Sequence, residues 1–391
     1  MAINIKPADR ISNVSEYYFS KKLKEIAQLN AEGKDIISLG IGSPDMPPSP
    51  QTIKALTEDA HDSAAHGYQS YIGIPELRQA FATFYKKNFG VELNPANEIQ
   101  PLMGSKEGVM HISLAFLNKG DEVLVPNPGY PTYSSVSNIV EAKIINYDLD
   151  ENNGWQPDFE KLGSMDLSRV KLMWVNYPNM PTGARATKEL FEKLVDFGRR
   201  HNIIIVNDNP YSFILNNEKL SILSIPGAKD ICIELNSLSK SHNMPGWRMA
   251  MVASNPQFIE WILRIKSNMD SGMFRPMQKA AVAALTTNSD EWHEKHNIEL
   301  YAKRRALAEE IMTTLGCSFD KDQVGMFLWG KIPSKYESSA ELADRVLYDA
   351  RVFITPGFIF GSNGEKYVRI SLCSKEDKLQ NALDRIKENI K

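Results

Sequence analysis

The stretch NIIIVNDNPYSF, residues 202–213, decides the fold class. Its first seven residues contain four consecutive branched apolar residues and end in an aspartate. Apolar runs of this kind are typical of strands that a parallel sheet buries on both faces. Similar runs recur between about residues 100 and 255, at DEVLVPN (121–127), AKIINYDL (142–149), VKLMWVNY (170–177), DICIELNS (230–237) and RMAMVAS (248–254). We expect all six runs to be strands.

A helix is predicted between two of these strands, at TKELFEKLVDFGRRH (187–201). Thr187 is a suitable N-cap residue, and Glu189 places an acid in the first turn. The apolar residues of this segment share one helical face, at Leu190, Phe191, Leu194, Val195 and Phe197. Strands that alternate with helices predict an α/β fold with a mixed or parallel sheet.

The rest of the chain reads as a second, smaller α+β domain. A helical region at 257–287 is interrupted near Gly272 and Pro276, and helices are expected at about 291–315 and 375–390. The Pro- and Gly-rich stretch 41–50 is expected to be extended. With 391 residues the chain is too long for one comfortable core. We predict a large domain at 49–287 and a small domain formed by 1–48 and 288–391.

Composition excludes several classes of protein. A net charge of -3 gives no reason to expect nucleic acid or an anionic membrane as partner. The opening MAINIKPADR has no apolar run of signal-peptide length, and no stretch approaches the length of a membrane span. The cysteines Cys232, Cys317 and Cys373 form neither a disulfide framework nor a metal motif. We therefore expect a cytoplasmic protein and no bound metal.

The sharpest chemical motif is SLSKSHNMPGWRMA, residues 237–250. Lys240 follows a buried-type strand, and the carboxyl end of such a strand is where α/β sheets bind their ligands. An amine held there can lose its proton through desolvation and nearby cations and then attack a carbonyl carbon. Arg248 is such a cation, and its guanidinium can bind a phosphate through two hydrogen bonds.

This motif resembles the S-x-S-K-x(7)-R segment of the class I aminotransferases. Further matches follow the family's order from about residue 35 to 372. The resemblance implies fold type I of the enzymes that use pyridoxal 5′-phosphate (PLP), with a mostly parallel seven-stranded sheet between helices in the large, PLP-binding domain. It also implies that Lys240 holds PLP as a Schiff base and then serves as general acid and base.

Asp208 and Tyr211 stand at D-x-x-Y spacing at the end of the most apolar strand. A buried carboxylate needs a cationic partner, because unpaired burial of its charge is very costly. By the resemblance, that partner is the pyridinium nitrogen of PLP, whose protonated ring acts as an electron sink. Tyr211 is then expected to bond the 3-hydroxyl group of the cofactor.

Two other segments are expected to contact the cofactor. MGSKEGVMHISLAFL (103–117) reads as a loop that feeds a helix, and backbone N–H groups at a helix N-terminus bind phosphate. By the resemblance, Gly104, Ser105 and Lys106 hold the phosphate together with Ser237 and Arg248. In PNPGYPTY (126–133) the aromatic residue Tyr130 is expected to stack on the cofactor ring.

One position departs from the family pattern. The usual N-P-T-G motif reads Asn179-Met180-Pro181-Thr182-Gly183 here. Met180 cannot donate the hydrogen bond that the family's asparagine makes to the 3-hydroxyl group. Either Asn179 replaces it through a shifted loop, or Tyr211 carries the role alone, and we favour the second alternative.

Substrate contacts are expected near both ends of the chain. By the resemblance, Arg369 in EKYVRISLC grips the α-carboxylate, for which a guanidinium fork is well matched. Gly42 in LGIGSPD is expected to let the backbone approach the same group. Tyr68 and, more weakly, Ser271 resemble residues that reach the phosphate of a neighbouring subunit, which implies a homodimer with shared sites. Arg275 is a weak candidate for a distal carboxylate.

We interpret the chain as a PLP-dependent aminotransferase that moves an amino group between an L-amino acid and a 2-oxo acid by a ping-pong mechanism. Glutamate is the expected donor, and the segments around Lys106 and Ser271 resemble most the diaminopimelate- and alanine-type subgroup. A carbon–sulfur β-lyase or a decarboxylase on the same fold is the alternative. A PLP-binding regulator without catalysis is a third, disfavoured because the first 30 or so residues are not basic enough to bind DNA.

Overall fold

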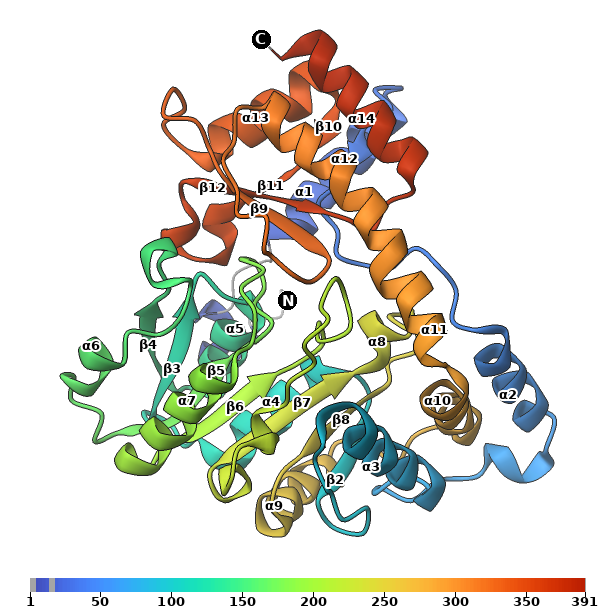
Figure 1. Ribbon diagram of the computed structural model, residues 1–391. Helices are drawn as coiled ribbons and strands as arrows, with labels where there is room; N and C mark the ends of the chain where they lie inside the picture. Colours follow the sequence, from blue (N-terminus) through green and yellow to red (C-terminus); the bar gives the residue numbers. More distant parts are fainter. Residues whose placement is uncertain (1–4, 14–17, 391) are drawn as a thin grey trace.

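The computed structural model describes residues 5–13 and 18–390 and shows two bodies joined by a long helix (Figure 1). The larger body surrounds a seven-stranded sheet, and the smaller body lies above it in this view. Residues 1–4, at the start of the opening segment, lie outside the described residues. Within the described ranges, no helix has both the length and the apolar character needed to cross a membrane.

The large sheet has the order β2-β8-β7-β6-β5-β3-β4. All its pairs are parallel except those of β8, which runs antiparallel to both neighbours. The strands are β2 (Ile99–Leu102), β3 (Glu122–Asn127), β4 (Lys143–Asp148), β5 (Val170–Val175), β6 (Ile204–Asp208), β7 (Cys232–Ser237) and β8 (Ala250–Ala253). The six predicted strands are confirmed, and β2 was not predicted.

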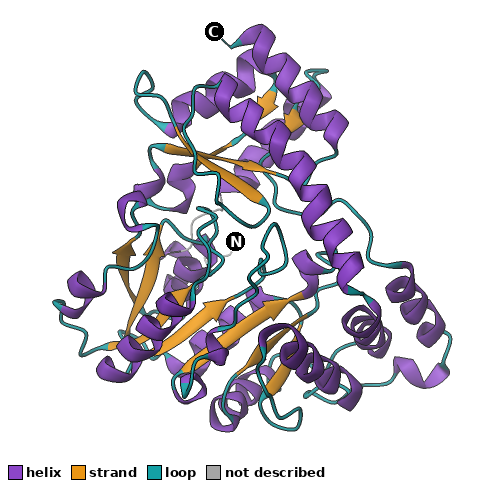
Figure 2. Ribbon diagram, viewed as in Figure 1, coloured by secondary structure: helices purple, strands orange, loops and turns teal. Residues whose placement is uncertain are grey.

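Helices cover both faces of this sheet (Figure 2). One face packs on α4 (Ser105–Phe116), α5 (Pro131–Ile139) and α9 (Pro256–Lys266). The opposite face packs on α3 (Pro75–Phe89), α7 (Lys188–His201) and α10 (Arg275–Thr287). Alternate strand residues point to opposite cores, so Leu172 and Trp174 join the first and Met173 and Val175 the second. The predicted α/β class, with a mostly parallel sheet between helices, is confirmed.

The predicted cap residue begins α7. The Thr187 hydroxyl accepts a hydrogen bond from the Leu190 N–H at 3.1 Å, and Asn202 ends the helix with a φ of 55°. The five apolar residues predicted for one face are all buried. The helix therefore forms where a good N-cap and an amphipathic pattern coincide.

The smaller body has a core of its own. Its antiparallel sheet has the order β11-β12-β9, and β1 pairs in parallel with β10. Its elements are α1 (Tyr18–Ala31), β1 (Ile37–Ser38), α12 (Leu300–Thr314), β9 (Phe327–Lys331), α13 (Ser339–Ala350), β10 (Val352–Phe353), β11 (Thr355–Pro356), β12 (Tyr367–Ser371) and α14 (Glu376–Asn389). The first described helix thus packs beside the last third of the chain (Figure 1).

The remaining elements are short or connect the two bodies. The predicted interruption of the 257–287 region is present, because α9 ends at Lys266 and α10 begins at Arg275. The long connecting helix is built from α11 (Asp290–His293), a π-helical turn (Glu294–Glu299) and α12. Also present are α2 (Pro50–Ala60), α6 (Phe159–Gly163), α8 (Leu238–Ser241) and 3-10 turns at Asp9–Asn13, Ser63–His66, Glu151–Asn153, Ile222–Ser224, Ala228–Asp230, Gly357–Phe360 and Ser362–Gly364.

Candidate active site

A cavity of about 430 Å³ lies at the carboxyl ends of the parallel strands, where the smaller body meets the sheet. Asp208 ends β6, Ser237 ends β7 and Asn176 directly follows β5. Of the residues singled out from the sequence, ten line this cavity: Gly42, Ser105, Lys106, Tyr130, Asp208, Tyr211, Ser237, Lys240, Arg248 and Arg369. The fold therefore gathers side chains that lie far apart in the sequence.

Lys240 points from α8 toward the smaller body. Its Nζ donates a hydrogen bond to the Gly42 carbonyl oxygen at 2.5 Å. Desolvation lowers the pKa of Lys240 below the ordinary value for a lysine, and the cations Arg369 and Arg248 lower it further. A lower pKa makes the neutral, nucleophilic amine more abundant at neutral pH. A Cβ atom on Gly42 would lie 2.2 Å from the Phe327 ring, so glycine is needed for this close approach.

Asp208 is buried, with 5% of its surface exposed. Its Oδ2 accepts a hydrogen bond from the Tyr133 hydroxyl at 3.0 Å, whereas no donor among the described residues reaches its Oδ1. Burial raises the pKa of Asp208 to about 6, and the bond from Tyr133 acts in the opposite direction. A buried carboxylate with one unbonded oxygen suits a cationic N–H group, because such a group supplies both a hydrogen bond and the compensating charge.

Two further tyrosines line the same part of the cavity. Burial raises the pKa of Tyr211 above its ordinary value, although nearby Arg369 partly counters this. Burial also raises the pKa of Tyr130. Both hydroxyl groups therefore stay protonated at neutral pH and can donate hydrogen bonds. The Tyr130 ring meets the Tyr133 ring edge to face, with 5.5 Å between centroids.

The N-terminus of α4 forms the end of the cavity that suits an anion. Gly104 is the N-cap residue with a φ of 89°, and a Cβ atom there would lie 2.0 Å from Nη2 of Arg248. The side chains of Ser105, Lys106 and Arg248 line the cavity, and no partner among the described residues reaches the Ser105 hydroxyl. A helix N-terminus, a lysine and an arginine together make a strong phosphate site.

Arg369 lines the cavity from β12 of the smaller body and is buried. Its Nη2 donates to the Gly40 carbonyl oxygen at 2.9 Å, and its guanidinium stacks on Phe327, 3.9 Å from the ring centroid. The second edge of the guanidinium meets the sulfur of Met180, with 3.2 Å from Nη1 to Sδ. Aromatic stacking holds the fork in one plane, which favours binding of a planar carboxylate.

The structure places Asn179 outside the residues that line the cavity. Its Nδ2 donates to the Asn176 carbonyl oxygen at 3.1 Å, and its Oδ1 accepts from the Thr182 hydroxyl at 2.7 Å. The amide is therefore used within its own turn, whereas Met180 faces the cavity. The structure therefore does not bring Asn179 to the cavity.

Three predicted residues lie away from this cavity. Tyr68 is 93% exposed, and Ser271 is exposed in the loop before α10. The guanidinium of Arg275 is ion-paired with Asp59, 3.0 Å away, and with Asp62. Arg275 is thus held at the surface of α2, which leaves its proposed role toward a distal carboxylate without support.

The sequence prediction missed two polar residues of the cavity that bond to Asp208. Tyr133 donates to Asp208, and Asn176 donates to the Asp208 carbonyl oxygen at 2.6 Å. Both left a trace in the sequence. Tyr133 follows Tyr130 by three positions, which puts two side chains at a helix start on one face. Asn176 directly follows a parallel strand beside the strand that bears Asp208, where ligand contacts are expected.

Comparison with protein families gives one match that spans nearly the whole chain. The model of aminotransferase class I and II matches residues 34–386. The chain belongs to this family. Among class I and II aminotransferases, LL-diaminopimelate aminotransferase of Nitratidesulfovibrio vulgaris is 40% identical over 98% of this chain and 99% of the relative. The corresponding enzyme of Oleidesulfovibrio alaskensis is 41% identical over 97% and 98%, respectively.

Solved structures agree with this assignment. Substrate-bound BacF from Bacillus subtilis is 36% identical, with a TM-score of 0.92 over 99% of this chain and 98% of BacF. A mutant of the Thermus thermophilus aspartate aminotransferase is 25% identical, with a TM-score of 0.91 over 98% of this chain and 99% of that one. The chain is a PLP-dependent aminotransferase of fold type I. The open Asp208 oxygen and the anion site at α4 fit PLP.

Proposed function

We propose that this aminotransferase holds PLP between Lys240, Asp208 and the N-terminus of α4, and binds the substrate's α-carboxylate with Arg369. The arrangement that carries the proposal is a nucleophilic amine and a buried carboxylate between an anion site and a stacked guanidinium in one cavity. When bound, PLP supplies an electrophilic carbon and a cationic ring that withdraws electrons from the substrate's Cα.

Each cavity residue then has a defined task. Lys240 would hold PLP through its amine and, once released, would move the proton at the substrate's Cα. Asp208 keeps its charge next to the cationic ring nitrogen. The hydrogen bond from Tyr133 orients that carboxylate, and Asn176 holds the Asp208 backbone through its carbonyl oxygen. Tyr211 donates a hydrogen bond to the 3-hydroxyl group, and Tyr130 packs on the ring. Lys106 and Arg248 would neutralise the phosphate, and Gly104, Ser105 and Ser237 would give it backbone and hydroxyl hydrogen bonds.

For the substrate we propose LL-diaminopimelate, with 2-oxoglutarate and glutamate as the other pair. Support comes from the relatives of that name, which are about 40% identical over nearly the full length. Met180 also affects substrate binding in this proposal, because its sulfur accepts a hydrogen bond from Nη1 of Arg369, the side chain that would bind the carboxylate.

We also propose that the active form is a cytoplasmic homodimer. Tyr68, Tyr71, Met269 and Phe274 are all exposed, and the rings of His66 and Phe274 lie 5.9 Å apart, which links the two segments that bear them. A second copy of the chain would cover this apolar surface and receive Tyr68 and Ser271 at its phosphate. The three cysteines are free and buried, which fits a reducing compartment. We further propose the domain boundaries predicted from the sequence.

An absorbance spectrum of the protein with PLP tests the reaction, and sedimentation tests the dimer. A visible Schiff-base band should give way to a near-ultraviolet band when glutamate or LL-diaminopimelate is added. Absence of a visible band would refute the role of Lys240. A band that persists with both amino acids would refute the proposed substrates, and release of pyruvate and ammonia from cystathionine without an oxo acid would favour a lyase.

A further inference from the structure

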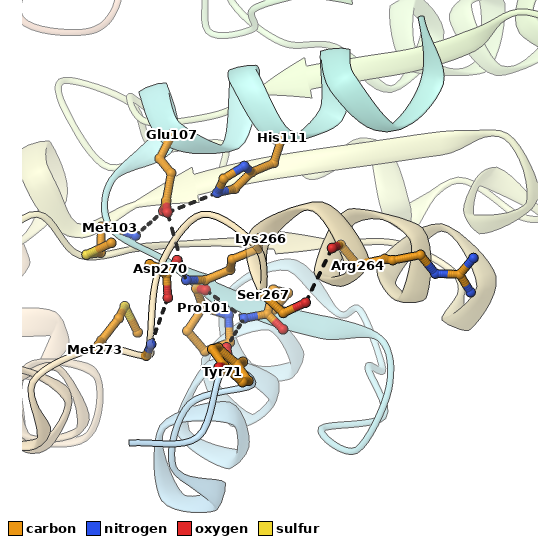
Figure 3. Close-up of polar contacts among 12 residues, drawn as sticks. Tyr71, Pro101, Met103, Glu107, His111, Arg264, Lys266, Ser267, Asp270 and Met273 are labelled. Carbon is orange, nitrogen blue, oxygen red and sulfur yellow. Dashed lines mark hydrogen bonds and ion pairs between the residues drawn. The ribbon is translucent and has the colours of Figure 1, made fainter. Parts of the chain in front are cut away.

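A buried ion network lies directly behind the anion site (Figure 3). Glu107 and His111 project from α4, and Lys266 and Asp270 project from the end of α9 and the loop after it. The Lys266 side chain is fully buried and is ion-paired with Asp270. Its Nζ also lies 3.8 Å from Oε1 of Glu107, which in turn lies 3.0 Å from Nε2 of His111. None of the four side chains lines the active-site cavity.

The cation of this network is the lysine itself. The ligand atoms of Glu107, His111 and Asp270 lie within 4.8 Å of one another, close enough to share a metal ion. The ammonium group of Lys266, however, bonds to Asp270 and lies beside Glu107. A buried ammonium group is costly unless carboxylates compensate its charge. Lys266 therefore compensates the charges of the two acids, and the two acids compensate the charge of Lys266.

The same two carboxylates also fix two backbone turns. The second oxygen of Glu107 accepts the Met103 N–H at 2.5 Å, directly before Gly104. The second oxygen of Asp270 accepts the Gly272 N–H at 2.8 Å. Gly272 has a φ of 87°, and a Cβ atom there would lie 2.3 Å from the Gln69 carbonyl oxygen. The network therefore connects the turn 103–106 to the loop 270–272, and through this close contact to the residue next to Tyr68.

We propose that the Glu107–Lys266–Asp270 triad positions the turn 103–106 for the phosphate group of PLP without touching it. The inference rests on the proposed function, because it requires that turn to hold the phosphate. Backbone N–H groups bind an anion only when they converge on one point. Loss of the triad would free Met103 and its neighbours to move, and a misplacement of about 1 Å is enough to weaken an aligned set of donors.

The test compares two cofactors, PLP and pyridoxal, which differ only in the phosphate. Each binds to the cofactor-free protein, and its dissociation constant is read from the visible band formed with Lys240. In Lys266→Met we expect PLP to bind roughly tenfold more weakly, whereas pyridoxal binds as it does to the unchanged protein. Lys266→Arg keeps the charge and should restore most of the preference for PLP.

Two further variants complete the design. Asp270→Asn retains an acceptor for the Gly272 N–H but weakens the ion pair with Lys266. It should weaken the binding of PLP, and not of pyridoxal, by a smaller factor than Lys266→Met. If Lys266→Met does not fold, Asp270→Asn serves as the test in its place. Lys161→Met removes an exposed ion pair with Asp148, 3.2 Å long, and should leave both constants unchanged.

Three outcomes separate the inference from the proposed function. An unchanged preference for PLP in both Lys266→Met and Asp270→Asn would overturn the positioning role. Equal weakening of PLP and pyridoxal would also overturn it, because the triad would then only stabilise the fold. If the unchanged protein forms no visible band with PLP, the proposed role of Lys240 fails first.

Discussion

Removal of the Tyr133 hydroxyl should destabilise the cofactor-free protein by an amount that depends on pH. The hydroxyl donates to Oδ2 of Asp208 at 3.0 Å, and the pKa of Asp208 is raised to about 6 by burial. A hydrogen bond to a charged carboxylate contributes about 2–3 kcal/mol and one to a neutral carboxyl group about 1 kcal/mol. In Tyr133→Phe the pKa of Asp208 should therefore rise by about one more unit, since one unit corresponds to about 1.4 kcal/mol.

The sign follows from the number of protons bound in each state. The folded protein holds the Asp208 proton up to about pH 6, whereas an unfolded chain releases it near pH 4. Stability conferred by this group is therefore present at low pH and is lost as the pH rises to about 6. In Tyr133→Phe the loss should continue to about pH 7, so the variant is destabilised by about 1 kcal/mol at pH 5 and by about 2–3 kcal/mol at pH 8.5.

Urea unfolding at these two pH values measures the difference, with Tyr147→Phe as the matched control. The Tyr147 hydroxyl is also buried but donates to the Trp174 carbonyl oxygen at 2.7 Å, a partner that does not titrate. Its removal should cost about 1 kcal/mol at both pH values. If Tyr133→Phe loses the same free energy of unfolding at pH 5 and pH 8.5, the electrostatic account of Asp208 is wrong.

Three other variants test residues predicted from the sequence, two in the cavity and one outside it. Lys240→Ala should abolish turnover and the visible Schiff-base band while PLP still binds noncovalently, and normal turnover would refute its role. Arg369→Lys should raise the KM for the amino acid roughly tenfold with a smaller effect on kcat, because an ammonium group cannot replace the two parallel hydrogen bonds; an unchanged KM would contradict this. Arg275→Ala should retain activity on dicarboxylic substrates, since Asp59 and Asp62 already hold its guanidinium; a selective loss for dicarboxylates would reverse that conclusion.

Five of the six strands that the sequence revealed, β3 and β5 to β8, are buried along almost their whole length, where apolar runs are longest, and only the edge strand β4 is largely exposed or half-buried. The unpredicted β2 has only four residues and contains Pro101, which argues against a strand. It lies at the edge of the sheet and pairs only with β8, so one side of its backbone needs no partner and proline is tolerated there. Pairing of this kind depends on the neighbouring strand, which local sequence cannot show.

Site residues could be predicted where a short sequence motif contains the reactive side chain and its neighbours at a fixed spacing. Lys240, Arg248 and Asp208 stand in segments with distinctive spacing, and all three line the cavity. The triad around Lys266 was not predictable, since a lysine at the end of an amphipathic helix usually lies in solvent. Its burial arises from the packing of α9 and α4 on the same face of the sheet, which no local pattern encodes.

The π-helical turn at Glu294–Glu299 fixes how the connecting helix meets both bodies. Asn297 within it donates to the Ser241 carbonyl oxygen at 2.8 Å, next to Lys240. Farther along the same helix, Arg304 binds both oxygens of Asp45, close in sequence to Gly42. Deletion of one residue from the turn would restore regular α-helix and rotate everything beyond it by roughly 100°. Arg304 would then face away from Asp45 and their ion pair would be lost. The number of residues in this turn is therefore fixed by the contacts that the helix makes with both bodies.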